Sequence, residues 1–154
     1  MLLAIGIALV LVLITFSFHY RILLWIGSSS FKLKFLPQTQ VLGIVIVLFF
    51  VHVVEIGFYG IAYYVSVEWL GLGSFSGALT NEPMSYLYYS GVIFTSLGLG
   101  DIYPQGHVRF ITAIETLNGL LLITWTASFT FLAMSRLWHW NDGCCGTEDK
   151  ENKL

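Results

Sequence analysis

Three long apolar runs, separated by polar segments, set the pattern of this chain. They cover residues 1–18, 41–67 and 110–137. A helix needs about 20 consecutive apolar residues to cross the hydrocarbon core of a bilayer. Each run therefore predicts a membrane-spanning helix, and the expected fold class is an all-α membrane protein.

A shorter apolar stretch, residues 84–95, lies between the second and third runs and is too short to cross a bilayer. Pro83 suits the first turn of a helix there, and Asn81 or Ser85 is a suitable cap. A glycine-rich stretch follows at residues 96–101, named here the filter segment. Non-helical backbone at membrane depth must be buried in protein or line water. The pattern predicts a re-entrant loop between two spanning helices.

The first run has two interpretations, a retained helix or a cleaved signal peptide. A signal peptide needs a positively charged start and a small-residue cleavage site. Residues 1–18 have neither, which favours a retained peripheral helix. The linker that follows, residues 19–40, is expected to lie at the membrane interface. The segment 68–83 is expected to form a loop, and Tyr103 and Pro104 are expected to form a turn.

Basic residues predict the orientation of the chain. The linker carries Arg21, Lys32 and Lys34 and no acidic residue. Cytoplasmic loops are enriched in Lys and Arg, so the linker is expected inside. The N-terminus is then outside and the tail, residues 138–154, is cytoplasmic. Arg109 is the one basic residue expected outside.

The composition narrows the function classes. The chain of 154 residues is 56% hydrophobic and only 10% charged, whereas soluble domains carry about a quarter charged residues. Its mean hydropathy is +0.79. A net charge of -2 gives no sign of a nucleic-acid partner. No nucleophile, base and orienting group converge, so we expect no enzyme, no cofactor and no small-molecule substrate.

The spacing of Gly98 and Gly100 has a physical use. Glycine adopts backbone angles that other residues avoid, and alternating left- and right-handed angles let successive carbonyls point towards one axis. The preceding short helix would aim its negative C-terminal end at a cation. A glycine pair followed by an acidic residue is also a common turn, but its position between a half-length helix and a spanning helix favours an ion pathway.

A resemblance supports this interpretation. From Tyr88 to Pro104 the chain reads YYSGVIFTSLGLGDIYP, which resembles the pore signature of the two-transmembrane potassium channel family. The resemblance extends over about residues 86–134, and residues 109–121 resemble the pore-lining helix of small bacterial ion channels. It implies a bacterial inner-membrane protein whose one pore loop supplies a quarter of a ring, and hence a homotetramer.

The resemblance also assigns the parts of the pore. The implied pore domain is residues 41–137, with an outer helix at 41–67, a pore helix at 84–95 and an inner helix at 110–137. The filter of the family reads TVGYG, and its carbonyl oxygens replace the hydration shell of K⁺. The ion-binding residues implied in this chain are Ser96, Leu97, Gly98, Leu99 and Gly100, with K⁺ sites at the first four.

Three positions depart from the family's filter. Ser96 replaces threonine and keeps a hydroxyl, Leu97 replaces valine, and Leu99, the largest departure, replaces a tyrosine whose hydroxyl braces the filter. Packing by Tyr88, Tyr89 or Phe94 is an alternative brace. The interpretations left open are a potassium channel, a weakly selective cation channel and a non-conducting scaffold subunit.

Further residues are expected to support the filter mouth or to lie at its edge. Thr95 precedes the filter, and Asp101 follows it, with Arg109 as a candidate partner for Asp101. Gly119 is either a bending point of the inner helix or a site of close helix packing. Cys144 and Cys145 lie in the tail, and their spacing to His139 matches no established zinc pattern. Metal binding with His139, juxtamembrane lipidation and no specific role are the interpretations left open for them.

The ionisable residues His52, Glu55 and Glu115 lie well inside the second and third apolar runs. Charged side chains are costly in lipid, so all three are expected to face protein or water. His52 and Glu55 are three residues apart and share a helix face. Their role is a buried brace, a proton-sensitive gate, or a zinc site or catalytic base.

Overall fold

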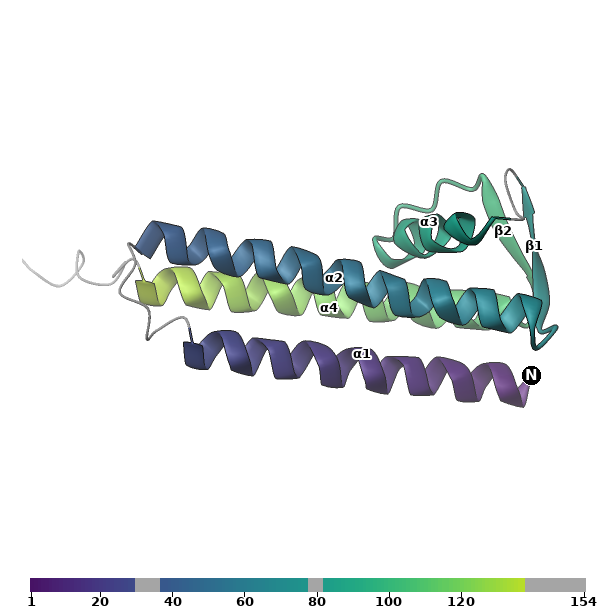
Figure 1. Cartoon of the computed structure of the whole chain (residues 1–154), viewed down its shortest axis with the longest axis horizontal. Coiled ribbons are helices and arrows are strands. Elements are labelled where there is room, and N and C mark those ends of the chain that lie inside the picture. The colour runs from purple at the N-terminus through teal and green to yellow at the C-terminus, as the bar shows by residue number, and fades with distance from the viewer. Residues whose placement is uncertain (30–36, 78–81, 138–154) are drawn as a thin grey trace, which may run out of the picture.

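The computed structural model describes residues 1–29, 37–77 and 82–137 (Figure 1). Its elements, in chain order, are α1 (Leu2–Ser29), α2 (Pro37–Glu68), β1 (Gly73–Gly77), α3 (Pro83–Phe94), β2 (Ile102–Gly106) and α4 (Val108–Leu137). The tail, with His139, Cys144 and Cys145, lies outside the described residues. The expectations for these three residues therefore have no structural counterpart here.

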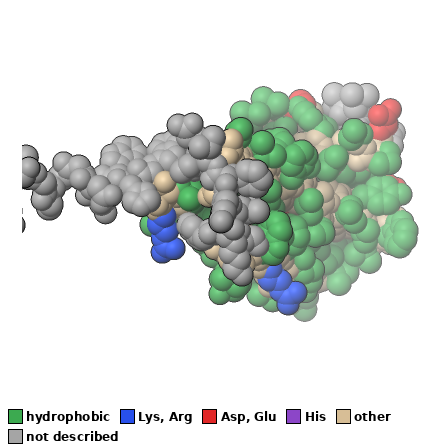
Figure 2. Space-filling view, turned by 60° about the vertical axis from the view of Figure 1, so that its left-hand side comes forward, with side chains coloured by type: hydrophobic (Ala, Val, Ile, Leu, Met, Phe, Trp, Pro, Cys, Tyr) green, Lys and Arg blue, Asp and Glu red, His purple; other side chains and the backbone are tan. Residues whose placement is uncertain are grey.

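Three helices, α1, α2 and α4, are long and apolar enough to cross a membrane. They lie side by side, with α3 and the two strands gathered towards one end of the bundle (Figure 1). Figure 2 shows a surface covered by hydrophobic side chains, with arginine side chains towards one end and acidic side chains towards the other. The predicted fold class, three spanning helices with a short re-entrant helix, is confirmed.

The first helix is longer than its apolar run, because α1 continues to Ser29. The expectation that it ends at residue 18 and that a linker occupies 19–40 is wrong. Leu23 and Ile26 pack into a buried cluster with Leu48 of α2 and Ala133 of α4. This burial continues the helix past the polar residues that suggested a linker, and α2 already begins at Pro37.

The short helix α3 begins one residue earlier than expected, with Pro83 in its first turn. Glu82 stands at the N-cap position and makes no side-chain cap bond, so Ser85 is not the cap. Asn81 lies outside the described residues. The helix ends at Phe94, and Thr95 forms its C-cap through a backbone bond to the carbonyl of Gly91.

The strands β1 and β2 are the feature that the sequence pattern did not predict. They pair antiparallel, with Gly73 opposite Gly106 and Gly77 opposite Ile102. The expected loop at 68–83 and turn at Tyr103 and Pro104 are therefore wrong in part. A side chain on Gly77 would lie 2.0 Å from the carbonyl oxygen of Asp101, so glycine is required there. The glycine and serine content that permits this approach also hides the strand pattern.

Aromatic rings join the small sheet to the helices. Phe75 of β1 packs edge-to-face against Tyr63 of α2 and against Tyr86 and Tyr89 of α3, with ring centroids 4.6–5.6 Å apart. Tyr63, Tyr86 and Tyr89 are buried. Edge-to-face aromatic pairs add stabilisation beyond their buried area. β2 directly follows the filter segment, so this packing holds the outer end of that segment against α2 and α3.

Candidate functional site

The filter segment has an alternating backbone conformation. Ser96, Gly98 and Gly100 have φ angles of 58°, 59° and 75°, whereas Leu97 and Leu99 have negative φ. A positive φ is disfavoured for a residue with a side chain, so Ser96 is a strained position and the two glycines are not. This is the left- and right-handed alternation that the spacing of the glycines predicts.

The first three residues of the segment bond their backbone N–H groups to α3, that of Gly98 donating to the carbonyl of Val92 at 3.4 Å. The N–H groups of Ser96 and Leu97 donate to the carbonyls of Ile93 and Val92, each at 2.9 Å. Within the part of the chain that the structure describes, the carbonyl oxygens of residues 96–100 accept no hydrogen bond. Residues 95–101 are exposed in a single chain, Leu97 at 63% and Leu99 at 57%. The carbonyl groups and apolar side chains of the segment are therefore free to contact groups that do not belong to the same chain.

Asp101, at the outer end of the filter segment, is held from two sides. The hydroxyl of Tyr88 in α3 donates to its Oδ2 at 2.7 Å, and the N–H of Ile102 donates to its Oδ1 at 3.0 Å. The Tyr88 bond lowers the pKa of Asp101 and raises that of Tyr88. No ion pair joins Asp101 and Arg109 within the described part of the single chain, and their pairing stays a prediction.

Close packing fixes the inner end of the same segment. The hydroxyl of Thr95 donates to the carbonyl of Gly91 at 2.8 Å, so it satisfies a carbonyl in the last turn of α3. A side chain on Gly119 of α4 would lie 2.2 Å from the carbonyl oxygen of Phe94, the last residue of α3. Glycine at 119 therefore lets α4 touch the end of α3.

Glu115 of α4 is fully buried behind α3. Ser90 of α3 donates a hydrogen bond to its Oε1 at 2.5 Å, and the hydroxyl of Tyr63 of α2 donates to its Oε2. The carboxylate thus connects three helices and faces protein on all sides. These hydrogen bonds fix the position of α3 relative to α2 and α4.

A second buried polar group, named here the histidine cluster, consists of His19, His52, Glu55 and Thr126. Nδ1 of His19 lies 2.9 Å from Oε1 of Glu55, and Nδ1 of His52 lies 2.9 Å from Oε2. Nε2 of each histidine lies near Oγ1 of Thr126, at 3.2 Å for His19 and 3.0 Å for His52. The cluster joins α1, α2 and α4, and the ring of His52 lies 5.8 Å from that of Phe94.

Sequence reasoning found His52, Glu55 and Glu115 but missed their partners. His19 was placed in a linker, although the apolar positions that follow it continue the helix. Thr126 and Ser90 are hydroxyl residues within apolar runs, where they usually bond their own backbone. A polar residue in each neighbouring run at matching depth is the signal that could have found them.

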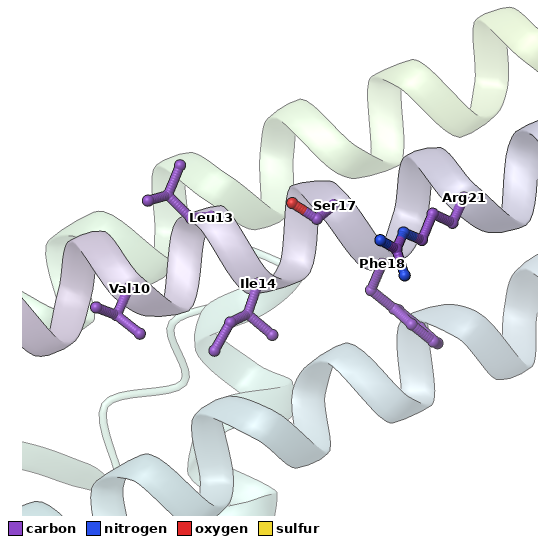
Figure 3. Close-up of a pocket in the computed structure, with 6 residues that line it drawn as sticks. All are labelled: Val10, Leu13, Ile14, Ser17, Phe18 and Arg21. Atoms are coloured by element: carbon purple, nitrogen blue, oxygen red, sulfur yellow. The ribbon is translucent and has the colours of Figure 1, made fainter.

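A shallow groove of about 470 Å³ runs along α1 and is lined by Val10, Leu13, Ile14, Ser17, Phe18 and Arg21 (Figure 3). All six lining residues belong to α1, so no second element closes the groove. It has no residue in common with the filter segment or the histidine cluster.

Comparison with known proteins shows to which family this chain is similar. A family model described as "Ion channel" matches residues 42–136, which is most of the chain. The match includes most of α2, all of α3 and the filter segment, and nearly all of α4. An uncharacterized membrane protein of Bacillus subtilis (strain 168), YdjJ, is 37% identical over 60 residues, 36% of this chain. The match covers 18% of that relative's length. No solved structure matches the chain significantly.

The family match and the geometry concern the same residues. The matched range begins in the second spanning helix, passes through the short helix and the filter segment, and ends in the last spanning helix. The helix α1 lies outside it. The chain therefore belongs to the two-transmembrane, pore-loop ion channel family.

Proposed function

We propose that the chain is one subunit of a homotetrameric, potassium-selective channel. K⁺ would pass between rings formed by the carbonyl oxygens of Ser96, Leu97, Gly98 and Leu99, with Gly100 completing the filter. The observation that carries the proposal is the alternation of positive φ at Ser96, Gly98 and Gly100. Such an alternation lets consecutive carbonyls share one direction, as a filter that replaces the hydration shell of an ion requires.

The unpaired carbonyls support assembly into a ring. A buried carbonyl without a partner costs several kcal/mol in a bilayer. The carbonyls of residues 96–100 have no hydrogen-bond partner within the described chain. Desolvated cations, bound by the carbonyls of four copies together, would be their partners. The exposed side chains of Leu97 and Leu99 would be covered in the same assembly.

The bond between Tyr88 and Asp101 bears on ion preference. Leu99 lacks the hydroxyl with which the family's tyrosine braces the filter. In this chain a tyrosine of α3 reaches the outer end of the filter segment instead. A braced carbonyl ring resists collapse around a smaller ion, which supports preference for K⁺ over Na⁺. The alternatives are a weakly selective cation channel and a non-conducting subunit.

The orientation we propose has the N-terminus outside and the C-terminus in the cytoplasm of a bacterial cell, in its inner membrane. Arg136 lies in the last turn of α4, at the end of the bundle that also holds the C-terminal end of α1 and the start of α2 (Figure 1). Glu68 closes α2 at the opposite end. Arg136 at the proposed cytoplasmic end agrees with the positive-inside rule, and Arg109, at the start of α4, is the one described basic residue at the opposite end.

Native mass spectrometry and ion flux test this function together. The purified protein in mild detergent is expected to have the mass of four chains, and its proteoliposomes are expected to release K⁺ when a counter-ion path is supplied. Mainly dimeric protein would contradict the homotetramer. Tetramers that carry no cation flux would favour the non-conducting subunit, and equal K⁺ and Na⁺ flux would favour the weakly selective channel.

A further inference from the structure

The histidine cluster takes no part in the proposed ion pathway, yet it gathers three metal-binding side chains in one place. His19, His52 and Glu55 each offer a ligand atom, and these atoms lie within 4.8 Å of one another. We propose that the cluster is a binding site for a divalent transition metal ion, with zinc as the ion that its ligands fit best. Its ligands come from α1 and α2, and Thr126 of α4 supports them.

The ligand types match zinc. Two imidazole nitrogens and one carboxylate are the donor set of zinc sites that keep a fourth position open. His19 and Glu55 have fully buried side chains, and the side chain of His52 is 18% exposed. Partial exposure of His52 gives an ion a path of entry. Water or hydroxide can fill the fourth position, and hydroxide would cancel the positive charge left after pairing with Glu55.

Without a bound ion, the histidine cluster has too few hydrogen atoms on its imidazole and hydroxyl groups to complete all four of its hydrogen bonds. If both histidines are neutral, each Nδ1–H donates to one oxygen of Glu55, and each Nε2 then carries a lone pair. Both lone pairs face Oγ1 of Thr126, at 3.2 Å and 3.0 Å. Thr126 has one hydroxyl hydrogen, so it satisfies one histidine and leaves the other facing an oxygen lone pair.

A metal ion removes this mismatch. With the ion bound at both Nδ1 atoms and at Glu55, each histidine carries its hydrogen on Nε2. Both Nε2–H groups can then donate to Thr126, because a hydroxyl oxygen accepts two hydrogen bonds. Metal-binding histidines commonly donate their second N–H to such a partner, which fixes the ring orientation. Thr126 is already placed to serve both rings.

The position of the site links the peripheral helix to the pore. His19 is the only one of the three ligands on α1, and its ring also packs against Trp125 of α4, tilted by 37° with centroids 5.6 Å apart. The ring of His52 lies 5.8 Å from that of Phe94, where α3 ends. A bound ion would therefore hold α1 against the helices that support the filter segment.

Zinc binding to the full-length channel in detergent tests the site directly. Cys144→Ser, Cys145→Ser and His139→Ala form the background, because these side chains can bind zinc independently. After chelation and dialysis against zinc, elemental analysis is expected to give one zinc per chain. Zinc is also expected to raise the melting temperature. X-ray absorption is expected to show nitrogen and oxygen neighbours at about 2.0–2.1 Å from the metal.

Matched variants separate this site from non-specific binding. Glu55→Gln keeps the size of the side chain and is expected to lose the stoichiometric zinc. Thr126→Val leaves all three ligands in place and is expected to weaken zinc affinity about 10- to 100-fold. His107→Ala, at an exposed histidine outside the bundle, is the control and is expected to bind like the background.

Two results would overturn the proposal. One is background protein that takes up less than one zinc per four chains and melts at the same temperature with and without zinc. The other is equal zinc affinity in the background and in both Glu55→Gln and Thr126→Val. Either result would mean that the cluster is a hydrogen-bonded brace, completed by one additional proton instead of a metal ion.

Discussion

The hydroxyl of Tyr88 donates a 2.7 Å hydrogen bond to Oδ2 of Asp101, and this bond ties the end of the filter segment to the helix that precedes it. Tyr88 lies within α3, and Asp101 closes the segment at its outer end. The two residues are thirteen positions apart, so the bond connects the helix that precedes the filter to the last residue of the filter segment, directly before β2. The polar brace that Leu99 cannot provide is therefore available from another residue.

Tyr88→Phe removes this bond while keeping the ring. We expect the filter segment to collapse more often, and the permeability ratio of K⁺ over Na⁺ to fall by a factor of a few. Bi-ionic reversal potentials in planar bilayers measure this ratio. Tyr103→Phe, at an exposed tyrosine of β2, is the control and should leave the ratio unchanged. A Tyr88→Phe channel with the selectivity of the wild type would show that packing alone supports the filter.

The same bond predicts the pH range over which the filter is braced. The pKa of Asp101 lies below its ordinary value of 3.8, because Tyr88 bonds the carboxylate form. The pKa of Tyr88 lies above its ordinary value of 10.0 for the same reason. A group with a lowered pKa stabilises the structure above its ordinary value, and this contribution is lost as pH falls through the lowered one.

Selectivity is therefore expected to stay constant between about pH 5 and about pH 9 on the outer side, and to fall only below about pH 4. Reversal potentials recorded while the outer solution is titrated provide the measurement. Asp101→Asn keeps an acceptor oxygen but cannot titrate, so it should remove the acid-dependent loss. A midpoint near neutral pH that Asp101→Asn abolishes would show that the pKa of Asp101 is raised and not lowered.

Gly98→Ala tests the alternation of backbone angles. A left-handed conformation costs a residue with a side chain roughly 1–2 kcal/mol, and four subunits multiply this cost. Gly98 has a φ of +59° with nothing within 4 Å of an added side chain, so the cost is one of conformation. Selective K⁺ current is expected to be lost while the tetramer persists.

Gly71→Ala is the matched control for this substitution. Gly71 has a φ of +57° and equally open surroundings, but it lies outside the filter segment. It carries the same conformational cost and should keep selective current. Normal selectivity in Gly98→Ala, or equal loss in both variants, would contradict the assignment of residues 96–100 as the filter.

Gly119→Ala distinguishes close packing from bending of the inner helix. The added methyl group would lie 2.2 Å from the carbonyl oxygen of Phe94, so α3 and α4 must separate. Such overpacking typically costs about 1–3 kcal/mol. The melting temperature of the tetramer is therefore expected to fall. Gly43→Ala, with nothing within 4 Å, serves as the control. Unchanged stability with a lower open probability would instead support a bending point at Gly119.

The filter segment and its supporting helix could be predicted because their signals are local. A half-length apolar run, Pro83 at its start and glycines at 98 and 100 all lie within one short stretch. Their conformations follow from steric limits on single residues. The same reasoning extended to Glu55 and Glu115, since a carboxylate within an apolar run must find protein or water.

The contacts that cross the bundle could not be predicted in the same way. The polar character of His19 predicts a linker because it ends an apolar run, but in the structure its partner Glu55 is buried on α2, and Leu23 and Ile26 beyond it pack into the bundle. The pairing of β1 with β2 depends on glycines that let backbones approach, and such residues lower strand propensity. The length of α1 and the pairing of β1 with β2 both depend on contacts with residues distant in the sequence, which the local pattern does not contain.

The central claim is that four copies of residues 96–100 form a filter that prefers K⁺. The most direct test is the bi-ionic reversal potential of purified wild-type protein in a planar bilayer, with K⁺ on one side and Na⁺ on the other. The account predicts a potential close to that of a membrane permeable to K⁺ alone, abolished by Gly98→Ala and retained by Gly71→Ala. A reversal potential near zero with sustained current would contradict it.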